Sequence, residues 1–182
     1  MKSHYLILIA PDERLTRVAK PIDLDRIRQD PESLNVAVET ILEVIRKVDA
    51  VGLAAPQLGL PMRLVVTDLE EEGPKVYVNP SYEPLTSEGE ETKIERCFSA
   101  PYIDVPVSRP KRIMAHWFDR FGAEWVEPFE GFAARVFQHE TDHLEGHCLY
   151  ERLTEPEKTA YLYHTDSLRV RLAAKRASRG IE

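Results

Sequence analysis

The sequence predicts an α+β fold, in which strands are grouped together rather than alternating with helices. Two observations carry this prediction. Apolar residues recur at helical spacing near the start of the chain and again in its last third, while short β-branched or aromatic segments separated by Gly, Pro and acidic residues fill the middle. We therefore expect antiparallel strands between an early helix and two later ones.

The first predicted helix begins at Ser33, which is placed to cap its first turn, and ends at Val48. Its apolar residues lie on one face: Leu34, Val38, Ile41, Leu42, Ile45 and Val48. The helix leads into residues 51–57, a stretch of small residues broken by Pro56. This composition favours close backbone packing rather than regular structure.

Four short segments are predicted as antiparallel strands: residues 62–67, 75–79, 112–118 and 124–129. A second helix is expected over residues 132–145, where Gly146 ends it. A third helix should begin at Thr154, whose spacing to Glu157 matches a capping box, and the tail from Ala174 should fray. No internal repeat or long linker occurs, so we expect residues 1–182 to form a single catalytic domain.

Composition and charge exclude several classes of protein. A chain of 182 residues, 43% of them hydrophobic, has the size of one globular domain. Its net charge of -7 opposes strong attraction to DNA or to anionic membranes, and no apolar run is long enough for a membrane helix. The start of the chain lacks the features of a signal peptide, and two cysteines do not make a disulfide framework. These features predict a cytoplasmic protein.

One motif, His139-Glu140-Thr141-Asp142-His143, is typical of a metal-dependent hydrolase. Residues four apart on a helix face the same way, so His139 and His143 can both present ring nitrogens to one metal ion. Glu140 can lie beside that ion without binding it and take a proton from bound water. The alternative is a chance occurrence of this spacing on a solvated helix.

A catalytic metal usually has three protein ligands and an open position for water, so the chain must supply a third ligand. Metalloproteases with a helix of this kind take it from a histidine or glutamate downstream, but Leu149 stands at the first of these positions and no glutamate stands at the second. Cys97 is the better candidate, because a thiolate is a strong donor to iron or zinc and because a strand should end there. A metalloprotease is therefore the weaker hypothesis.

Three motifs together resemble, in order and spacing, the signature motifs of the peptide deformylases. They are Gly52-Leu53-Ala54-Ala55-Pro56-Gln57, Glu95-Arg96-Cys97-Phe98-Ser99 and Gln138-His139-Glu140-Thr141-Asp142-His143. The likeness covers nearly the whole chain. It implies antiparallel sheets packed around a central metal-binding helix, with one helix towards the N-terminus and another at the C-terminus.

The resemblance implies an enzyme that removes the formyl group from N-formylmethionyl nascent peptides and releases formate. Its metal would be Fe²⁺, the family's usual physiological ion, and Zn²⁺, Ni²⁺ or Co²⁺ would also suit the ligands. Glu140 would be the general base, while the Gln57 amide and the backbone N–H of Phe98 would hold the oxyanion. Three residues would bind the metal ion: Cys97, His139 and His143.

The same resemblance suggests which residues bind the substrate. Gly52 would let the peptide backbone approach closely, and Val51 and Val136 would line the pocket for the methionine side chain, although simple core packing is an alternative for Val136. Some family members carry a peptide-contacting arginine where this chain has Asp104. We therefore expect a changed preference downstream of methionine, with acidic peptides disfavoured.

Two further departures flank Cys97, since the family usually has glycine in place of Arg96 and leucine in place of Phe98. Arg96 either strains a left-handed backbone or points away from an extended strand, and we favour the second. Arg109 could brace the cysteine strand by pairing with Glu95, or form only a solvated ion pair. These departures motivate an alternative: a deformylase-like protein that binds formylated peptides or metal with little turnover, or that hydrolyses another N-acyl substrate.

The end of the chain carries five cations without an acidic residue between them: Arg169, Arg171, Lys175, Arg176 and Arg179. By resemblance this C-terminal basic helix could contact the ribosome, and a solvated helical face is the alternative. Cys148 is expected to be a buried, unpaired cysteine without a role.

Overall fold

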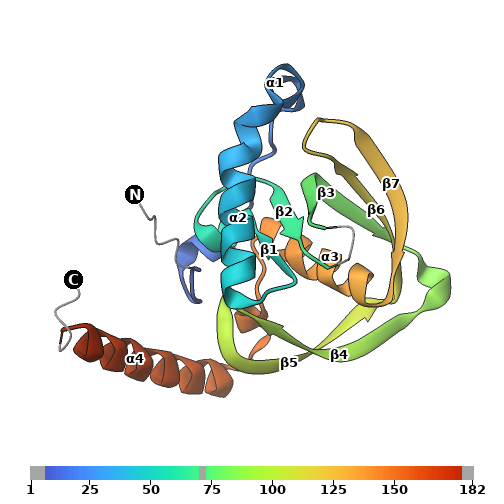
Figure 1. Ribbon diagram of the computed structural model, residues 1–182. Helices are drawn as coiled ribbons and strands as arrows, with labels where there is room; N and C mark the ends of the chain where they lie inside the picture. The colour runs from blue at the N-terminus through green and yellow to red at the C-terminus, as the bar shows by residue number, and fades with distance from the viewer. Residues whose placement is uncertain (1–6, 70–72, 178–182) are drawn as a thin grey trace.

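A central helix, α3 (Gly131–Leu144), packs against strands of two antiparallel sheets in the computed structural model of the chain (Figure 1). The structure describes residues 7–69 and 73–177, with side chains described as far as Asp166 apart from that of Thr86. One sheet has the strand order β1-β2-β3-β6-β7, and the other pairs β4 with β5. The predicted α+β class with antiparallel sheets around a central helix is confirmed.

The strands within this part of the chain are β1 (Gly52–Ala54), β2 (Leu64–Thr67), β3 (Lys75–Pro84), β4 (Glu90–Cys97), β5 (Ala100–Pro110), β6 (Arg112–Phe118) and β7 (Glu124–Glu130). The α-helices are α1 (Leu24–Gln29), α2 (Asn35–Val48), α3 and α4 (Glu155–Ala177). Every pairing between neighbouring strands in the two sheets is antiparallel.

Aromatic packing fixes α3 against the five-stranded sheet. Phe137, in the middle of the helix, is 2% exposed and meets the ring of Tyr77 edge to face at 5.2 Å. A second edge-to-face contact joins Phe137 to Phe129 of β7 at 5.3 Å. Such pairs add to the free energy of apolar burial, so the orientation of α3, and with it that of its histidines, is set by the core.

Helix α2 buries the predicted apolar face but begins differently from the prediction. Ser33 lies inside a 3₁₀ turn (Pro31–Leu34), and α2 has no side-chain cap at Leu34. The predicted Ser33 cap was wrong because Pro31, with its fixed φ, starts the helical turn earlier. The backbone N–H of Ser33 already donates to the Asp30 carbonyl at 3.0 Å, so Ser33 is within the turn and does not precede it.

Residues 51–57 are more regular than predicted. Gly52–Ala54 form β1, which pairs with β2, and Ala55–Leu58 form a 3₁₀ turn with Pro56 near its start. The prediction also missed most of the β4–β5 hairpin. Charged residues dominate the first half of β4, a composition with low strand propensity, so only the pairing with β5 identifies it as a strand.

The ends of the later helices follow their predicted signals. Gly146 has φ +78° and its N–H donates to the His143 carbonyl at 3.3 Å, which ends α3 one residue earlier than predicted. The Glu157 carboxylate accepts from the Thr154 N–H at 2.8 Å at the start of α4.

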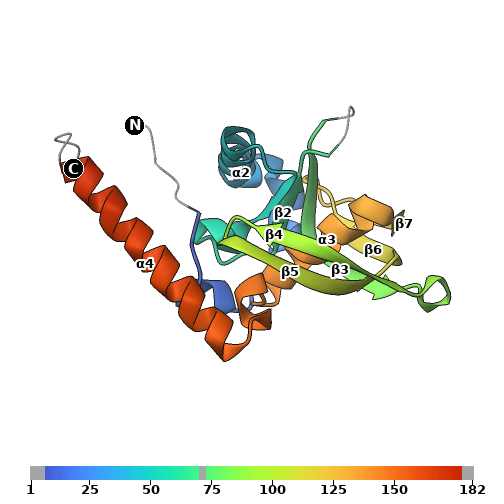
Figure 2. The same ribbon diagram turned by 90° about the horizontal axis from the view of Figure 1, so that it is seen from below.

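Helix α4 continues through Ala177 rather than fraying from Ala174, and the remainder of the predicted tail lies outside the described residues. Figure 2 shows α4 running away from the sheets. Among helices in the described ranges, none combines the length and the apolar character that a membrane span requires.

Candidate active site

Three predicted metal ligands meet at the centre of the molecule. His139 and His143 lie one turn apart on α3, and Cys97 is the last residue of β4. Their ligand atoms all lie within 4.8 Å of one another, and the Cys97 Sγ is 3.2 Å from the His143 Nε2. The tertiary fold therefore assembles a Cys/His₂ cluster from two segments that are far apart in sequence.

The chemistry of this cluster suits a metal ion. Burial opposes ionisation of the Cys97 thiol, but the imidazoles of His143 and His139 bring its pKa well below the usual range. A thiolate is the form of cysteine that binds metals. A thiolate with two imidazoles is a donor set that accepts iron, zinc, nickel or cobalt and leaves a position open for water.

Glu140 lies beside the cluster and is free to act on a ligand. It is 5% exposed, and its Oε2 has no hydrogen-bond partner among the described residues. Burial raises the pKa of Glu140, which brings the carboxylate closer to the range that suits a general base near neutral pH. Gly52 faces it so closely that a Cβ at residue 52 would lie 3.4 Å from the Glu140 Cγ.

Gln57 is held with its amide nitrogen towards the cluster. The Gln57 Oε1 accepts from the Ala54 N–H at 2.8 Å, which fixes which end of the amide faces the site. The Nε2 then lies 3.5 Å from the Cys97 Sγ and 3.3 Å from the Ser99 Oγ. Gln57 thus presents donor hydrogens next to a metal ligand, as an oxyanion-binding residue must.

A pocket of about 210 Å³ opens onto these residues. Two of the predicted metal ligands, Cys97 and His139, contribute to its wall, while the third, His143, does not. Asp104, predicted to bind substrate, lies outside it and lines a neighbouring hollow. The other predicted catalytic and substrate-binding residues all line the pocket: Val51, Gly52, Gln57, Phe98, Val136 and Glu140.

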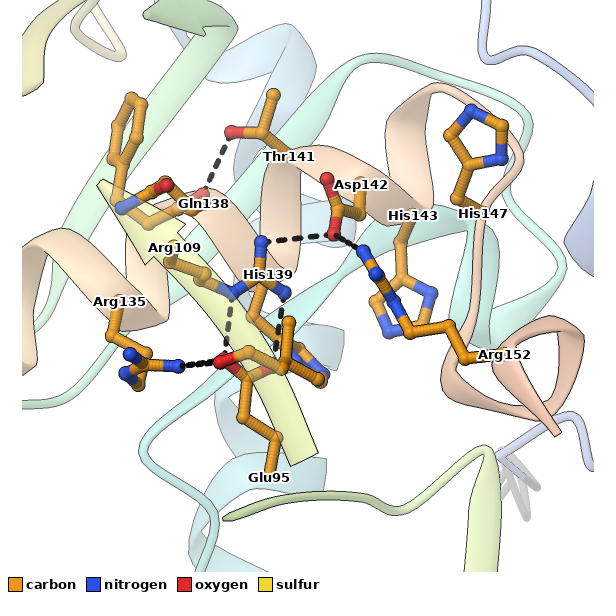
Figure 3. Close-up of polar contacts among 12 residues, drawn as sticks. Glu95, Arg109, Arg135, Gln138, His139, Thr141, Asp142, His143, His147 and Arg152 are labelled. Carbon is orange, nitrogen blue, oxygen red and sulfur yellow. Dashed lines mark hydrogen bonds and ion pairs between the residues drawn. The ribbon is translucent and has the colours of Figure 1, made fainter. Parts of the chain in front are cut away.

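Glu95 is the polar hub of the site, and the sequence revealed only one of its partners. The predicted pair with Arg109 is confirmed as a buried bidentate contact of 2.6 and 2.9 Å. Glu95 also accepts from the Arg135 Nη1 at 2.7 Å and lies 2.9 Å from the His139 Nδ1 (Figure 3). Burial alone would raise the pKa of Glu95, but hydrogen bonds from His139 and Arg109 bring it far below its usual value.

This hub orients a metal ligand. By engaging the Nδ1 of His139, Glu95 leaves the Nε2 to face the cluster, which is the usual second contact of a metal-binding histidine. Arg109 extends the network to Asp142 at 3.0 Å, on the same helix as His139 (Figure 3). Sequence reasoning missed Arg135 and Asp142, although their positions, four before and three after His139, place them on its side of α3.

Two departures from the family pattern, Arg96 and Asp104, form an ion pair with each other. Arg96 is not among the residues with positive φ, and its Nε and Nη2 contact the two carboxylate oxygens of Asp104 at 2.6 and 3.0 Å. The preferred interpretation of Arg96 is confirmed for the backbone, which is extended within β4, but the side chain lines the pocket instead of pointing away from it. Cys148 is buried and unpaired as predicted, and burial raises its thiol pKa to about 11.

Comparisons with known proteins agree with the geometry. The model of the family described as polypeptide deformylase matches residues 4–159. Peptide deformylase of Alkalilimnicola ehrlichii is 39% identical over 152 residues, covering 82% of this chain and 82% of that protein. That of Thermotoga maritima is 36% identical over 154 residues, covering 85% of this chain and 90% of the relative.

Solved structures show the same likeness. The crystal structure of a peptide deformylase from Legionella pneumophila has a TM-score of 0.79 at 33% identity, covering 93% of this chain and 96% of that one. The peptide deformylase structure from Thermus thermophilus has a TM-score of 0.74 at 35% identity, covering 94% and 98%. The family to which this chain belongs, as its three motifs predicted, is that of the polypeptide deformylases, which are metal-dependent enzymes.

Proposed function

We propose that this protein hydrolyses the formyl group of N-formylmethionyl peptides, with formate and a free amino terminus as products. The observation that carries the proposal is the Cys/His₂ cluster with the buried Glu140 beside it at a pocket. The reaction adds one water across the amide: its oxygen joins the formyl carbon, the C–N bond breaks, and a proton passes to the leaving nitrogen.

Cys97, His139 and His143 would hold the metal ion. A divalent ion in that position supplies Lewis acidity, which makes water more acidic and polarises a carbonyl group. We propose Fe²⁺ as the physiological ion, because the family resemblance favours it and the thiolate with two imidazoles suits it. Zn²⁺, Ni²⁺ and Co²⁺ fit the same donors.

Glu140 moves the protons. Its unpartnered Oε2 can take a proton from water as the oxygen attacks the formyl carbon, and can then deliver that proton to the amine as it leaves. Gln57 and the backbone N–H of Phe98 would donate hydrogen bonds to the oxyanion. The contact between Ala54 and the Gln57 Oε1 supports this role, because it fixes the donor end of the amide before substrate arrives.

The pocket favours an unbranched apolar side chain. Val51, Val136 and the close backbone at Gly52 would surround the methionine of the substrate. The wall also holds four charged side chains: Glu95 and Arg135 pair with each other at 2.7 Å, Arg96 pairs with Asp104, and Glu140 lies beside the cluster. Methionine fits such a site because its flexible thioether fills irregular apolar space.

Three further proposals follow from this function. We infer that residues 1–182 act as one catalytic domain, since α3 packs against strands of both sheets. A deformylase of nascent chains works where translation takes place, so we place the protein in the cytoplasm. Four of the C-terminal cations, Arg169, Arg171, Lys175 and Arg176, belong to α4, and their charge and the position of that helix would allow a ribosome contact (Figure 2).

The proposed activity is tested by measuring formate release from formyl-Met-Ala-Ser under anaerobic conditions with Fe²⁺, or with Ni²⁺ as a stable substitute. Glu140→Gln is the control, because it keeps the shape of the side chain but cannot take up the proton. We expect the variant to retain bound metal and to lose roughly 10²–10⁴-fold in kcat. Equal rates for the two metal-loaded proteins would overturn the proposal.

A further inference from the structure

We propose that Arg96 and Asp104 form a charged clasp at the mouth of the metal pocket, which selects substrates by the order of charges after formyl-methionine. The inference rests on the proposed deformylase function and concerns its specificity. It replaces the expectation that Asp104 acts alone and disfavours acidic peptides. The clasp presents a cation nearer the metal cluster and an anion farther away.

The two side chains are held together across the β4–β5 hairpin. Both contacts join a guanidinium nitrogen to a different carboxylate oxygen, at 2.6 and 3.0 Å, so the pair is bidentate. This geometry fixes the plane of the guanidinium group. It uses Nε and Nη2, which leaves the Nη1 of Arg96 to donate to another acceptor.

The two charges of the pair lie at different distances along the proposed path of the peptide. Arg96 lines the metal pocket and also an adjacent hollow of about 280 Å³, whereas Asp104 lines the hollow but not the metal pocket. Cys97 and Phe98 belong to both, so the two spaces adjoin. A peptide whose formyl group lies at the cluster and which leaves through the hollow passes Arg96 before it reaches Asp104.

A further negative charge lies on the outer side of the pair, beyond Asp104. Asp104 also lines an outer hollow against α4, where Glu157 contributes a second carboxylate. On the pocket side, the exposed side chains of Val51 and Phe98 are apolar, and the charged Glu95 and Arg135 of the wall pair with each other. An acidic residue directly after formyl-methionine would therefore meet a cation, and a basic residue further along would meet anions.

The expected size of the effect follows from exposure. The side chains of Arg96 and Asp104 are 78% and 54% exposed, so water screens their interaction with substrate. Exposed charge pairs contribute little, so the effect on the rate constant is small. We expect each matching charge to raise kcat/KM by roughly two- to fivefold.

The test compares two peptides of identical composition, formyl-Met-Glu-Lys-amide and formyl-Met-Lys-Glu-amide, with formyl-Met-Ala-Ala-amide as an uncharged reference. Because their net charges are equal, the overall charge of the protein cancels from the comparison. The wild-type protein should prefer the Glu-Lys order. The double variant Arg96→Asp, Asp104→Arg keeps an ion pair but reverses its direction, so it should prefer the Lys-Glu order.

Two single variants keep the proposal testable if the double variant does not fold. Arg96→Gln and Asp104→Asn should each bring the ratio of the two kcat/KM values closer to one, and added salt should do the same for the wild type. Equal turnover of both charged peptides by the wild type, or an unchanged preference in the variants, would overturn the clasp while leaving the deformylase function intact. If none of the three peptides released formate, the proposed function itself would be overturned.

Discussion

Replacing Glu95 with Gln should destabilise the protein more than any other single-atom change at the site. Each carboxylate oxygen of Glu95 has two nitrogen partners: Oε1 meets Arg109 and Arg135, and Oε2 meets Arg109 and His139. An amide has only one accepting oxygen, so in either orientation its NH₂ group faces two groups that also act as donors. Two guanidinium groups would also lose the buried anion between them.

The magnitude follows from burial. Glu95 and Arg109 have side chains only 5% and 4% exposed, and removing one partner of such a buried pair costs roughly 3–5 kcal/mol. The second contact of Arg109, to Asp142 at 3.0 Å, compensates part of its charge, so we expect about 3 kcal/mol. The measurement is urea denaturation of the metal-free protein at neutral pH, followed by the change in tryptophan fluorescence.

The matched control is Glu91→Gln on the same strand. Glu91 forms an ion pair with Lys93 at 2.9 Å, but its side chain is 43% exposed, so its loss should change the free energy of unfolding far less than the loss of Glu95. Affinity for Zn²⁺ should also fall roughly 10–100-fold in Glu95→Gln, because the Nδ1 of His139 loses its acceptor. A loss of stability equal to that of the control would refute the assignment of Glu95 as the hub.

Three other substitutions test separate parts of the fold. Gly146→Ala should lower the free energy of unfolding in the urea assay by at least about 1–2 kcal/mol, because Gly146 has a φ of +78°. The new Cβ would also lie 2.6 Å from the backbone oxygen of Thr16, which adds to this loss. A stability equal to that of the wild type would contradict this prediction. Phe137→Ala should cost roughly 3–5 kcal/mol in the same assay, since its ring is buried in an aromatic cluster, and a loss below 1 kcal/mol would disprove that packing. Gly52→Ala should lower both kcat/KM for formyl-Met-Ala-Ser and the urea midpoint, because its Cβ would lie 3.3 Å from methyl groups of Val136, in the pocket, and of the buried Thr67; unchanged kinetics would exclude this prediction.

Local patterns were sufficient for several features. The face of α2, the pairing of His139 with His143 and the end of α3 at Gly146 depend on residues within one or two turns of each other. Helical periodicity and left-handed glycine act over that range, so they can be recognised without a fold. The predicted Ser33 cap was wrong because Pro31, two residues earlier, already starts a turn.

The fold class, the metal-binding helix and, through three motifs, the family could all be predicted without the structure. Three sets of contacts depend on the folded chain: Cys97 with His143, Glu95 with Arg109, Arg135 and His139, and Arg96 with Asp104. These contacts join residues from different elements, and the charged composition of β4 does not reveal its register with β5. Strand pairing and buried ion networks depend on chain segments that the core brings together, and local sequence spacing does not specify those segments.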